Sequence, residues 1–179
     1  MINGGFEETK AWIFTITDST ADYSDDQAFS GARSARFGLL PGAAASAAAP
    51  GAPARIEYNL LGEFSAAGGT FSSGYQHSAI PADAVSATLH FWYKPGAQGT
   101  SSVDFQRVLL LKPDTHPYHL LKELMRVRLN STAWREVSLD LSAYRGNDVV
   151  LYFETYNDST SSTGRTWMFL DDVSLEVCR

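Results

Sequence analysis

The sequence predicts an all-β protein folded as a two-sheet antiparallel β-sandwich. Stretches of alternating apolar and polar residues recur along the chain, and turn signals rich in Gly, Pro, Asn and Asp separate them. We count about eight to ten short strands and no convincing helix, because the alternation has a period of two almost throughout. Strands of this number and spacing favour two antiparallel sheets packed face to face.

Composition limits the class of protein and its partners. The chain has 179 residues, 44% hydrophobic and 12% aromatic, which suits one globular domain over residues 1–179. A formal net charge of −6, with no run of Lys and Arg, argues against a nucleic-acid partner. No apolar run approaches the roughly 20 residues of a membrane-spanning helix, and no signal-peptide pattern opens the sequence. We therefore expect part of a longer polypeptide, with any secretion signal outside this sequence.

The first part of the chain carries the weaker strand signals. Residues 2–14 are typical of a turn and a first strand, and residues 30–38 of a Gly-led turn into a short strand. Residues 39–74 resemble an inserted loop, because the stretch 42–54 is rich in Ala but interrupted by Pro and Gly. A brief strand at 56–61 is the one element expected within this insertion.

The second part gives clearer strands. After a Pro-containing turn at 80–84, Leu89, Phe91 and Tyr93 alternate with polar or amphipathic residues and should face the core. The pattern at 119–129 fits a helix or a strand, and we favour the strand because the turn before it would complete a hairpin. The remaining strands are expected at 104–112, 134–141, 149–156 and 165–177.

The closing stretch places a carboxylate where an apolar residue is expected. With a period of two, Asp171 shares a face with Trp167, Phe169, Val173, Leu175 and Val177. A carboxylate in a core costs several kcal/mol unless it has partners. If the chain ends meet, Asp171 and Glu7 could share one cation. Alternatively, backbone N–H groups of the Gly-Gly turn at 3–5 could satisfy Asp171 without a metal.

The sequence lacks the common catalytic patterns. Its four histidines form no metal or triad spacing, and neither a G-x-S-x-G elbow nor a phosphate-binding Gly loop occurs. Glycoside hydrolysis by a pair such as Asp140 and Glu154 stays open, because only the separation of the carboxylates decides it. We expect a domain that is not an enzyme.

Aromatic residues on outward-facing strand positions indicate binding instead. If Leu151 and Phe153 are core residues, their neighbours on β-strand 149–156 point outward. Flat aromatic rings stack on sugar rings, and amides and carboxylates bind sugar hydroxyls. The candidate ligand-binding residues are Trp92, Gln106, Tyr152, Glu154 and Tyr156. Alternatively, these aromatics pack beneath the Ala-rich loop and Glu154 pairs with Lys94.

Several short motifs follow one another in a telling order: 3–7 with Trp12, 30–36, 80–84 with 89–93, Trp134 with 140–146, and 170–175. Together they resemble jelly-roll, galactose-binding-like domains of the carbohydrate-binding-module type, found in bacterial secreted and cell-surface proteins. The resemblance implies a non-catalytic extracellular or cell-surface domain whose partner is a glycan or another surface-protein domain. It also implies a structural calcium ion between the termini, held by Glu7 and Asp171 with backbone carbonyls near Gly5 and Ser30. The alternative is a structural, adhesive or assembly module without sugar affinity.

Overall fold

The computed structural model describes residues 1–42, 57–65, 69–158 and 164–179. Across these ranges the chain forms ten strands and a single 3-10 turn, and no α-helix occurs in them. None of the described segments is a helix that could span a membrane. The elements are β1 (Ile13–Phe14), β2 (Asp22–Ser24), β3 (Ser34–Gly38), β4 (Thr70–Ile80), β5 (Ser86–Gly99), β6 (Phe105–Lys112), β7 (His119–Val127), β8 (Arg135–Asp140), η1 (Ser142–Tyr144), β9 (Asn147–Asn157) and β10 (Gly164–Cys178).

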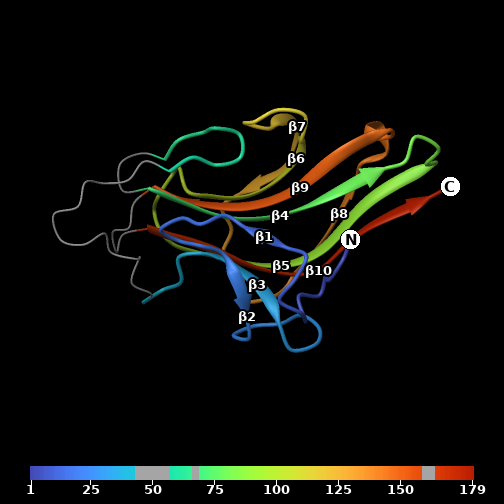
Figure 1. Ribbon diagram of the computed structural model, residues 1–179. Coiled ribbons are helices and arrows are strands. Elements are labelled where there is room, and N and C mark those ends of the chain that lie inside the picture. Colours follow the sequence, from blue (N-terminus) through green and yellow to red (C-terminus); the bar gives the residue numbers. More distant parts are fainter. Residues whose placement is uncertain (43–56, 66–68, 159–163) are drawn as a thin grey trace.

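The strands form two antiparallel sheets, which confirms the predicted β-sandwich and jelly-roll class. The first sheet has the strand order β1-β4-β9-β6-β7, and the second has the order β2-β3-β10-β5-β8. Figure 1 shows the two sheets as separate layers, with β9 and β4 above β5 and β10. Consecutive strands such as β4 and β5 lie in different sheets, so the chain crosses repeatedly between the layers.

The core fills the space between the two sheets. On β5, Leu89, Phe91 and Tyr93 point inward as predicted, and on β9 Leu151 and Phe153 do the same. All five are at most 4% exposed. Their neighbours in each strand therefore point away from the core, since successive side chains alternate between the faces of a sheet.

The predicted face assignment is wrong for the first half of β10. A period of two predicts Trp167 and Phe169 on the core face, whereas Met168 and Leu170 are the fully buried core residues there. Trp167 lies on the outer face, where its ring occupies the space that a side chain at Gly96 would fill. Both faces of this stretch are apolar, so the pattern of apolar and polar residues does not show which face points to the core.

A bulge in β10 explains why the second half agrees with the prediction. The register against β5 shifts between Asp171 and Ser174, and Asp172 has a φ of 47°. An extra residue at a bulge moves all later side chains to the opposite face. Val173 beyond the bulge is a core residue, while Asp171 before it lies on the outer face opposite Trp92.

The chain ends meet at this bulge, as the motif at residues 3–7 suggested. The backbone N–H of Val173 donates to the Gly4 carbonyl at 3.0 Å. A side chain at Gly4 would collide with the Val173 carbonyl oxygen, so the close approach requires glycine.

Two predicted boundaries differ from the structure. The predicted insertion at 39–74 extends too far, because β4 begins at Thr70. Its Gly- and Ser-rich start has the composition of a loop, but pairing with β9 along its whole length makes it a strand. The strand expected at 56–61 is reduced to an isolated bridge between Tyr58 and Phe64. Most of the Ala-rich stretch 42–54 lies outside the described residues.

Candidate ligand-binding groove

An aromatic row crosses three strands on the outer face of the first sheet. Phe71 of β4, Tyr156 of β9 and Phe105 of β6 lie directly opposite one another in the strand register. The ring centroids of Phe71 and Tyr156 are 4.9 Å apart, and those of Tyr156 and Phe105 are 5.4 Å apart. The row forms a continuous aromatic floor across the strands.

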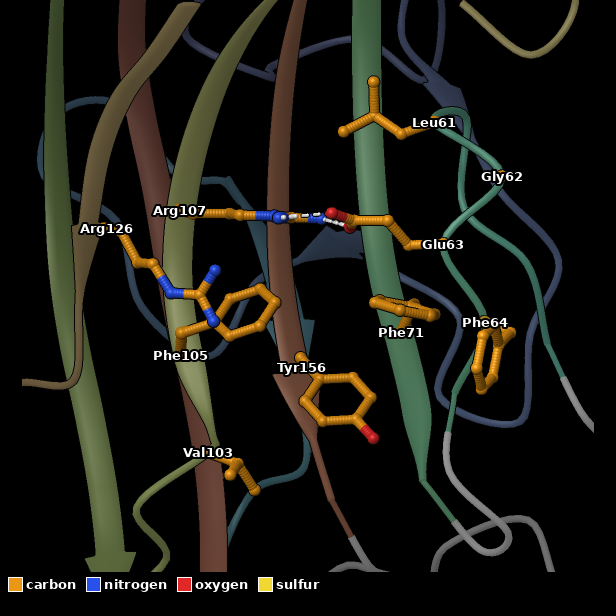
Figure 2. Close-up of a pocket in the computed structure, with 10 residues that line it drawn as sticks. All are labelled: Leu61, Gly62, Glu63, Phe64, Phe71, Val103, Phe105, Arg107, Arg126 and Tyr156. Carbon is orange, nitrogen blue, oxygen red and sulfur yellow. Dashed lines mark hydrogen bonds and ion pairs between the residues drawn. The ribbon is translucent and has the colours of Figure 1, made fainter. Parts of the chain in front are cut away.

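A groove of about 490 Å³ lies over this floor. Phe64 on one side is 69% exposed and Val103 on the other is 50% exposed, so both rims are apolar and open to solvent. Figure 2 shows the two rim residues on either side of the Tyr156 ring. The full lining is Leu61, Gly62, Glu63, Phe64, Phe71, Val103, Phe105, Arg107, Arg126 and Tyr156.

The groove occupies one half of the outer face of the first sheet, because residues 57–65 cover the adjacent part of that face. Leu60 and Leu61 of this segment pack with Tyr118 on a second apolar cluster of Leu109, Leu111, Val150 and Tyr152. The Tyr118 N–H donates to the Leu60 carbonyl at 2.8 Å, which ties the segment to the β6–β7 connection. The 57–65 segment thereby forms one end wall of the groove.

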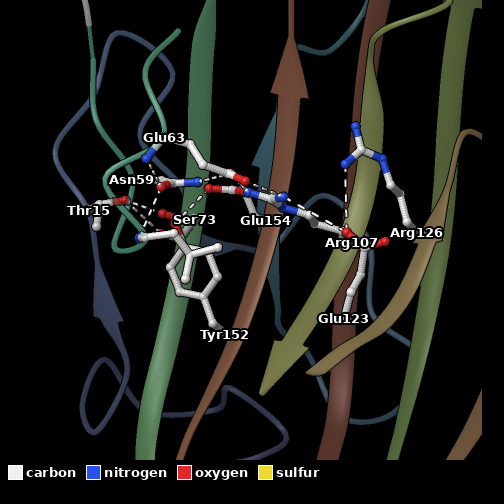
Figure 3. A network of polar contacts seen from close by, with 10 residues as sticks. Thr15, Asn59, Glu63, Ser73, Arg107, Glu123, Arg126, Tyr152 and Glu154 are labelled. Carbon is white, nitrogen blue, oxygen red and sulfur yellow. Dashed lines mark hydrogen bonds and ion pairs between the residues drawn. The ribbon is translucent and has the colours of Figure 1, made fainter. Parts of the chain in front are cut away.

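A buried ionic network connects this wall to the floor. The side chain of Arg107 on β6 is only 3% exposed, and its Nε donates to Glu154 on β9 at 2.6 Å. The same guanidinium contacts both carboxylate oxygens of Glu63 in the wall. The Tyr152 hydroxyl donates to the other oxygen of Glu154 at 2.7 Å, completing the network drawn in Figure 3.

Burial and charge pairing set the pKa values in the network. Burial raises the pKa of Glu154, although the nearby Arg107 opposes the rise. Burial would also raise the pKa of Glu63, but hydrogen bonds from Arg107 and Asn59 outweigh it, so the pKa is lowered. Burial would lower the pKa of Arg107, and the charges of Glu154 and Glu63 raise it instead. We conclude that Arg107 and Glu63 are charged at neutral pH.

Arg126 on the edge strand β7 completes the groove. Its guanidinium carbon lies 4.0 Å from the Phe105 ring centroid, and one of its nitrogens lies 3.6 Å from a Glu123 oxygen. Cation–π attraction of this kind favours the position of the guanidinium over the ring. About half of the Arg126 side chain is exposed, at 47%, so its donors can reach a bound molecule.

Three predicted ligand-binding residues share the outer face of β9, as expected, but they differ in access. Tyr156 lines the groove directly. Tyr152 and Glu154 are fully buried, and Glu154 pairs with Arg107 rather than with Lys94. Lys94 instead donates to Gln27 at 2.8 Å. Within this set, Tyr156 alone lines the groove, with 9% of its surface exposed, and the other two lie beneath the floor.

Gln106 does not belong to this face, so its expected place beside the β9 residues needs correction. It points between the sheets, is fully buried, and donates to the carbonyls of Gly96 and Trp167 at 2.9 and 3.0 Å. Its side-chain oxygen accepts the Leu129 N–H at 3.0 Å. Gln106 therefore links the two sheets, and its neighbours Phe105 and Arg107 face the groove.

Trp92 also lies elsewhere, because β5 belongs to the second sheet. It points outward as predicted, but on the opposite side of the sandwich from the groove. Phe29 stacks on it with ring centroids 3.8 Å apart, and Trp134 meets Phe29 edge-on at 6.0 Å. Trp92 thus anchors the loop before β3, and the structure does not bring it near Tyr156.

The predicted metal residues approach the same loop from two sides. Asp171 is fully buried, and its carboxylate accepts backbone N–H groups of Phe29 and Ser30 at 2.8 and 3.2 Å. Glu7 accepts those of Ala32 and Arg33 at 2.9 and 3.1 Å. Burial raises the pKa of Asp171, and the hydrogen bonds oppose the rise.

These backbone donors satisfy Asp171 without a cation, although they come from residues 29–30 rather than from the turn at 3–5. Two carboxylates with Asp172 beside them are also the hard oxygen donors that calcium prefers. No group of three or more carboxylate, His or Cys side chains with metal-binding geometry occurs in the described part of the chain. Calcium at this loop stays a prediction.

Asp140 and Glu154, the carboxylates considered for hydrolysis, lie on opposite outer faces. Glu154 faces outward from the first sheet, while Asp140 on β8 of the second sheet accepts the Ser142 N–H at 2.8 Å. The full thickness of the core separates them, so they cannot flank one glycosidic bond.

Most of the groove residues were not predicted from the sequence. Phe71 was assigned to a loop, and Phe105 and Arg107 were passed over because Gln106 between them was given the outward position. The run Val108–Leu111 after them is fully buried on both faces, so it offers no alternation to set the phase. The available signal was an aromatic residue and an arginine two positions apart, Phe105 and Arg107, which share one face of a strand.

Comparisons with solved structures support the predicted jelly-roll class. The structure of TmCBM61 in complex with β-1,4-galactotriose matches 99% of this chain and 97% of that chain, with a TM-score of 0.57 and 14% identity. The CBM22-2 xylan-binding domain from Paenibacillus barcinonensis Xyn10C matches over 97% and 95%, with a TM-score of 0.53 and 12% identity. The K1 cleaved adhesin domain of Lys-gingipain from Porphyromonas gingivalis W83 matches over 93% and 90%, with a TM-score of 0.51 and 11% identity.

At these identities the likeness establishes a shared fold. No family model matches the sequence, and no curated protein matches it either. The resemblance to jelly-roll carbohydrate-binding modules is therefore confirmed for the fold, and the groove carries the functional argument.

Proposed function

We propose that this chain is a non-catalytic carbohydrate-binding domain that holds a polysaccharide in the groove on its first sheet. The observation that carries the proposal is the aromatic row of Phe71, Tyr156 and Phe105 beneath an open groove with apolar rims. Aromatic rings recognise the apolar faces of sugars, and the Arg126 guanidinium offers donors for sugar hydroxyls. The shared fold with a galactotriose complex and a xylan-binding domain supports the same reading.

Affinity electrophoresis on a panel of neutral polysaccharides, including galactan and xylan, tests this proposal. The wild-type protein should be retarded by at least one of them. Tyr156→Ala and Phe64→Ala should lose most of the retardation, because each removes one ring of the groove. Phe64 is 69% exposed, so its variant leaves the core intact and remains informative if Tyr156→Ala folds poorly.

Trp92→Ala is the matched control, since it removes an aromatic ring from the opposite face. It should lower the melting temperature but leave retardation unchanged. If no polysaccharide retards the wild-type protein, or if Trp92→Ala abolishes retardation and Phe64→Ala does not, the groove is not the glycan site.

We further propose a structural calcium ion at the loop that contacts Glu7 and Asp171, in an extracellular or cell-surface setting. The support is the position of both carboxylates on the loop between residues 29 and 33, close to where the chain ends meet. When bound, the ion would add a cross-link between the N-terminal turn and β10.

Thermal unfolding in calcium and in EGTA, with elemental analysis, tests the ion directly. A ligand that binds only the folded state at a hundredfold excess over its dissociation constant stabilises by about 2.7 kcal/mol. EGTA should therefore lower the melting temperature of the wild-type protein, and Asp171→Asn should remove the calcium effect. Equal melting temperatures in both buffers and no bound metal would leave Asp171 as a hydrogen-bonded carboxylate alone.

A structural or adhesive module is the second candidate. It is favoured by the shared fold with the K1 adhesin domain and by the aromatic cluster of Phe29, Trp92 and Trp134, in which Phe29 is 40% exposed. Concentration-dependent self-association without any glycan retardation, measured by analytical ultracentrifugation, would support this candidate over the first.

A further inference from the structure

We propose that Glu63 and Arg107 are positioning residues for ligand binding, because their ion pair holds the 57–65 segment in place as the wall of the groove. This inference rests on the proposed glycan-binding function. It gives a role to two charged residues that line the groove and whose charges are used in ion pairs within the protein.

Arg107 lies between the floor and the wall of the groove. It projects from β6 on the groove face, directly opposite Glu154 in the register, and its side chain is 3% exposed. A guanidinium this deeply buried requires charged partners, since the desolvation penalty is several kcal/mol. Glu154 supplies one partner from within the sheet, and Glu63 supplies the other from the wall.

Hydrogen bonds with Asn59 hold Glu63 in the wall. Its backbone N–H donates to the Asn59 side-chain oxygen at 3.0 Å, and the Asn59 amide donates back to its carboxylate at 2.7 Å. The Asn59 N–H also donates to the Glu63 carbonyl at 3.1 Å. Glu63 is therefore fixed within a closed turn, so its bond to Arg107 fixes the turn as a unit (Figure 3).

This turn leads directly to the rim of the groove. Phe64 follows Glu63 in the chain and forms the exposed aromatic rim. Glu57, at the start of the segment, accepts the Phe71 N–H at 3.0 Å, and the Leu60 carbonyl accepts the Tyr118 N–H at 2.8 Å. Of these attachments, the Arg107–Glu63 pair is the one at the residue next to Phe64, so it sets the position of the Phe64 ring over the floor.

Hydrogen exchange measured by mass spectrometry tests the positioning without any ligand. In Glu63→Ala, amides of the 57–65 segment should exchange faster, while amides of β9 and β10 keep their protection. Glu123→Gln is the matched control, because Glu123 lies 3.9 Å from the same guanidinium but belongs to the edge strand β7. Unchanged exchange in the segment of Glu63→Ala would overturn the inference.

Binding affinity, measured by titration calorimetry with the best polysaccharide or oligosaccharide from the panel, tests the consequence. If the wall occupies its binding position in about a tenth of Glu63→Ala molecules, the apparent dissociation constant rises about tenfold. Glu63→Gln, which keeps an acceptor for Arg107, should lie between Glu63→Ala and wild type. Glu123→Gln, which loosens the contact with Arg126 but leaves the wall attached to Arg107, should weaken binding less than Glu63→Ala does.

A double-mutant cycle with Phe64→Ala separates positioning from a general loss of stability. If Glu63 acts through the Phe64 rim, Glu63→Ala should weaken binding much less in the Phe64→Ala background than in the wild type. Additive effects would contradict this route. A wild-type protein that binds no glycan overturns the proposed function, whereas wild-type binding with Glu63→Ala equal to Glu123→Gln overturns this inference alone.

Discussion

The guanidinium of Arg107 lies on the outer face of a sheet and is nevertheless almost fully buried, with carboxylates of three different segments around it. Glu154 comes from β9, Glu63 from the 57–65 segment and Glu123 from β7. Removing any one carboxylate changes the balance of charge in the network by one unit. The strength of each link depends on its burial, and Glu154 is the most buried of the three.

The Arg107–Glu63 pair should make folding stability depend on acid pH. The folded-state pKa of Glu63 is lowered, so its contribution is present above the unfolded-state value of about 4.3 and is lost as the pH falls through the folded-state value. Glu63→Gln lacks this contribution. The difference in unfolding free energy between wild type and Glu63→Gln should therefore be constant near neutral pH and shrink below about pH 4.

Urea unfolding of both proteins across this pH range measures the difference. Because Glu63 is about half exposed, at 47%, we expect the pair to contribute about 1 kcal/mol or less. Glu123, Glu154, Arg126 and Tyr152 also face the network, but they are present in both proteins, so their contributions to the difference largely cancel. A difference that grows on acidification would contradict the assigned direction of the Glu63 shift.

Among the elements, β10 shows most clearly what a strand pattern can and cannot predict. The alternation of side chains predicted that this strand exists and how long it is. It did not predict the bulge at Asp171 and Asp172, because a bulge exchanges the inward and outward positions without changing the composition. The same limit affected Gln106 on β6, where both faces are apolar. The inward face of a strand could be identified only where the other face carries polar residues, as on β5.

The contact between the N-terminal turn and the β10 bulge should respond sharply to side-chain volume. Gly4→Ala would place a methyl group against the Val173 carbonyl, which belongs to the backbone and cannot easily move. We expect a loss of about 1–3 kcal/mol in unfolding free energy, typical of overpacking. Denaturant unfolding of the variant measures this loss.

Gly5→Ala is the neighbouring control. A side chain there would meet a side-chain oxygen of Asp172 at 3.3 Å, and such an atom can shift. Its cost should be clearly smaller than that of Gly4→Ala. Equal costs at the two positions would mean that the termini are less closely packed than the Val173–Gly4 hydrogen bond indicates.

For the whole molecule, strand count and spacing favoured the sandwich, because many half-apolar strands bury their apolar faces when two sheets pack face to face. The groove was not predictable in the same way. It depends on which strands become neighbours: β4, β9 and β6 are adjacent in the sheet but distant in the chain. Phe71, Tyr156 and Phe105 therefore come together only in three dimensions, and Tyr156 alone was identified beforehand.

The charge of the molecule predicts a preference among polysaccharides. The net charge is −6, and the charged residues in and around the groove are three glutamates and two arginines. Like charges repel over distances of about a Debye length, roughly 10 Å at 0.1 M salt. We expect neutral polysaccharides to retard the protein and polygalacturonate to fail to do so at low salt.

Affinity electrophoresis at low and moderate ionic strength checks this preference. Retardation by a neutral polysaccharide should change little with salt, since the charges of the groove are paired within the protein. Strong retardation by polygalacturonate that disappears with added salt would instead identify Arg126 as an anion-binding group.

The groove and the chain ends occupy opposite ends of the sandwich. Phe71 lies near the start of β4, at the left in Figure 1, whereas β10 runs to the C-terminus at the right. Cys178, the last residue of β10, is an exposed free thiol. Molecules immobilised on a maleimide-coated sensor chip through this thiol would all be tethered by the same end, with the aromatic row at the far end of the sandwich and accessible to the flowing analyte.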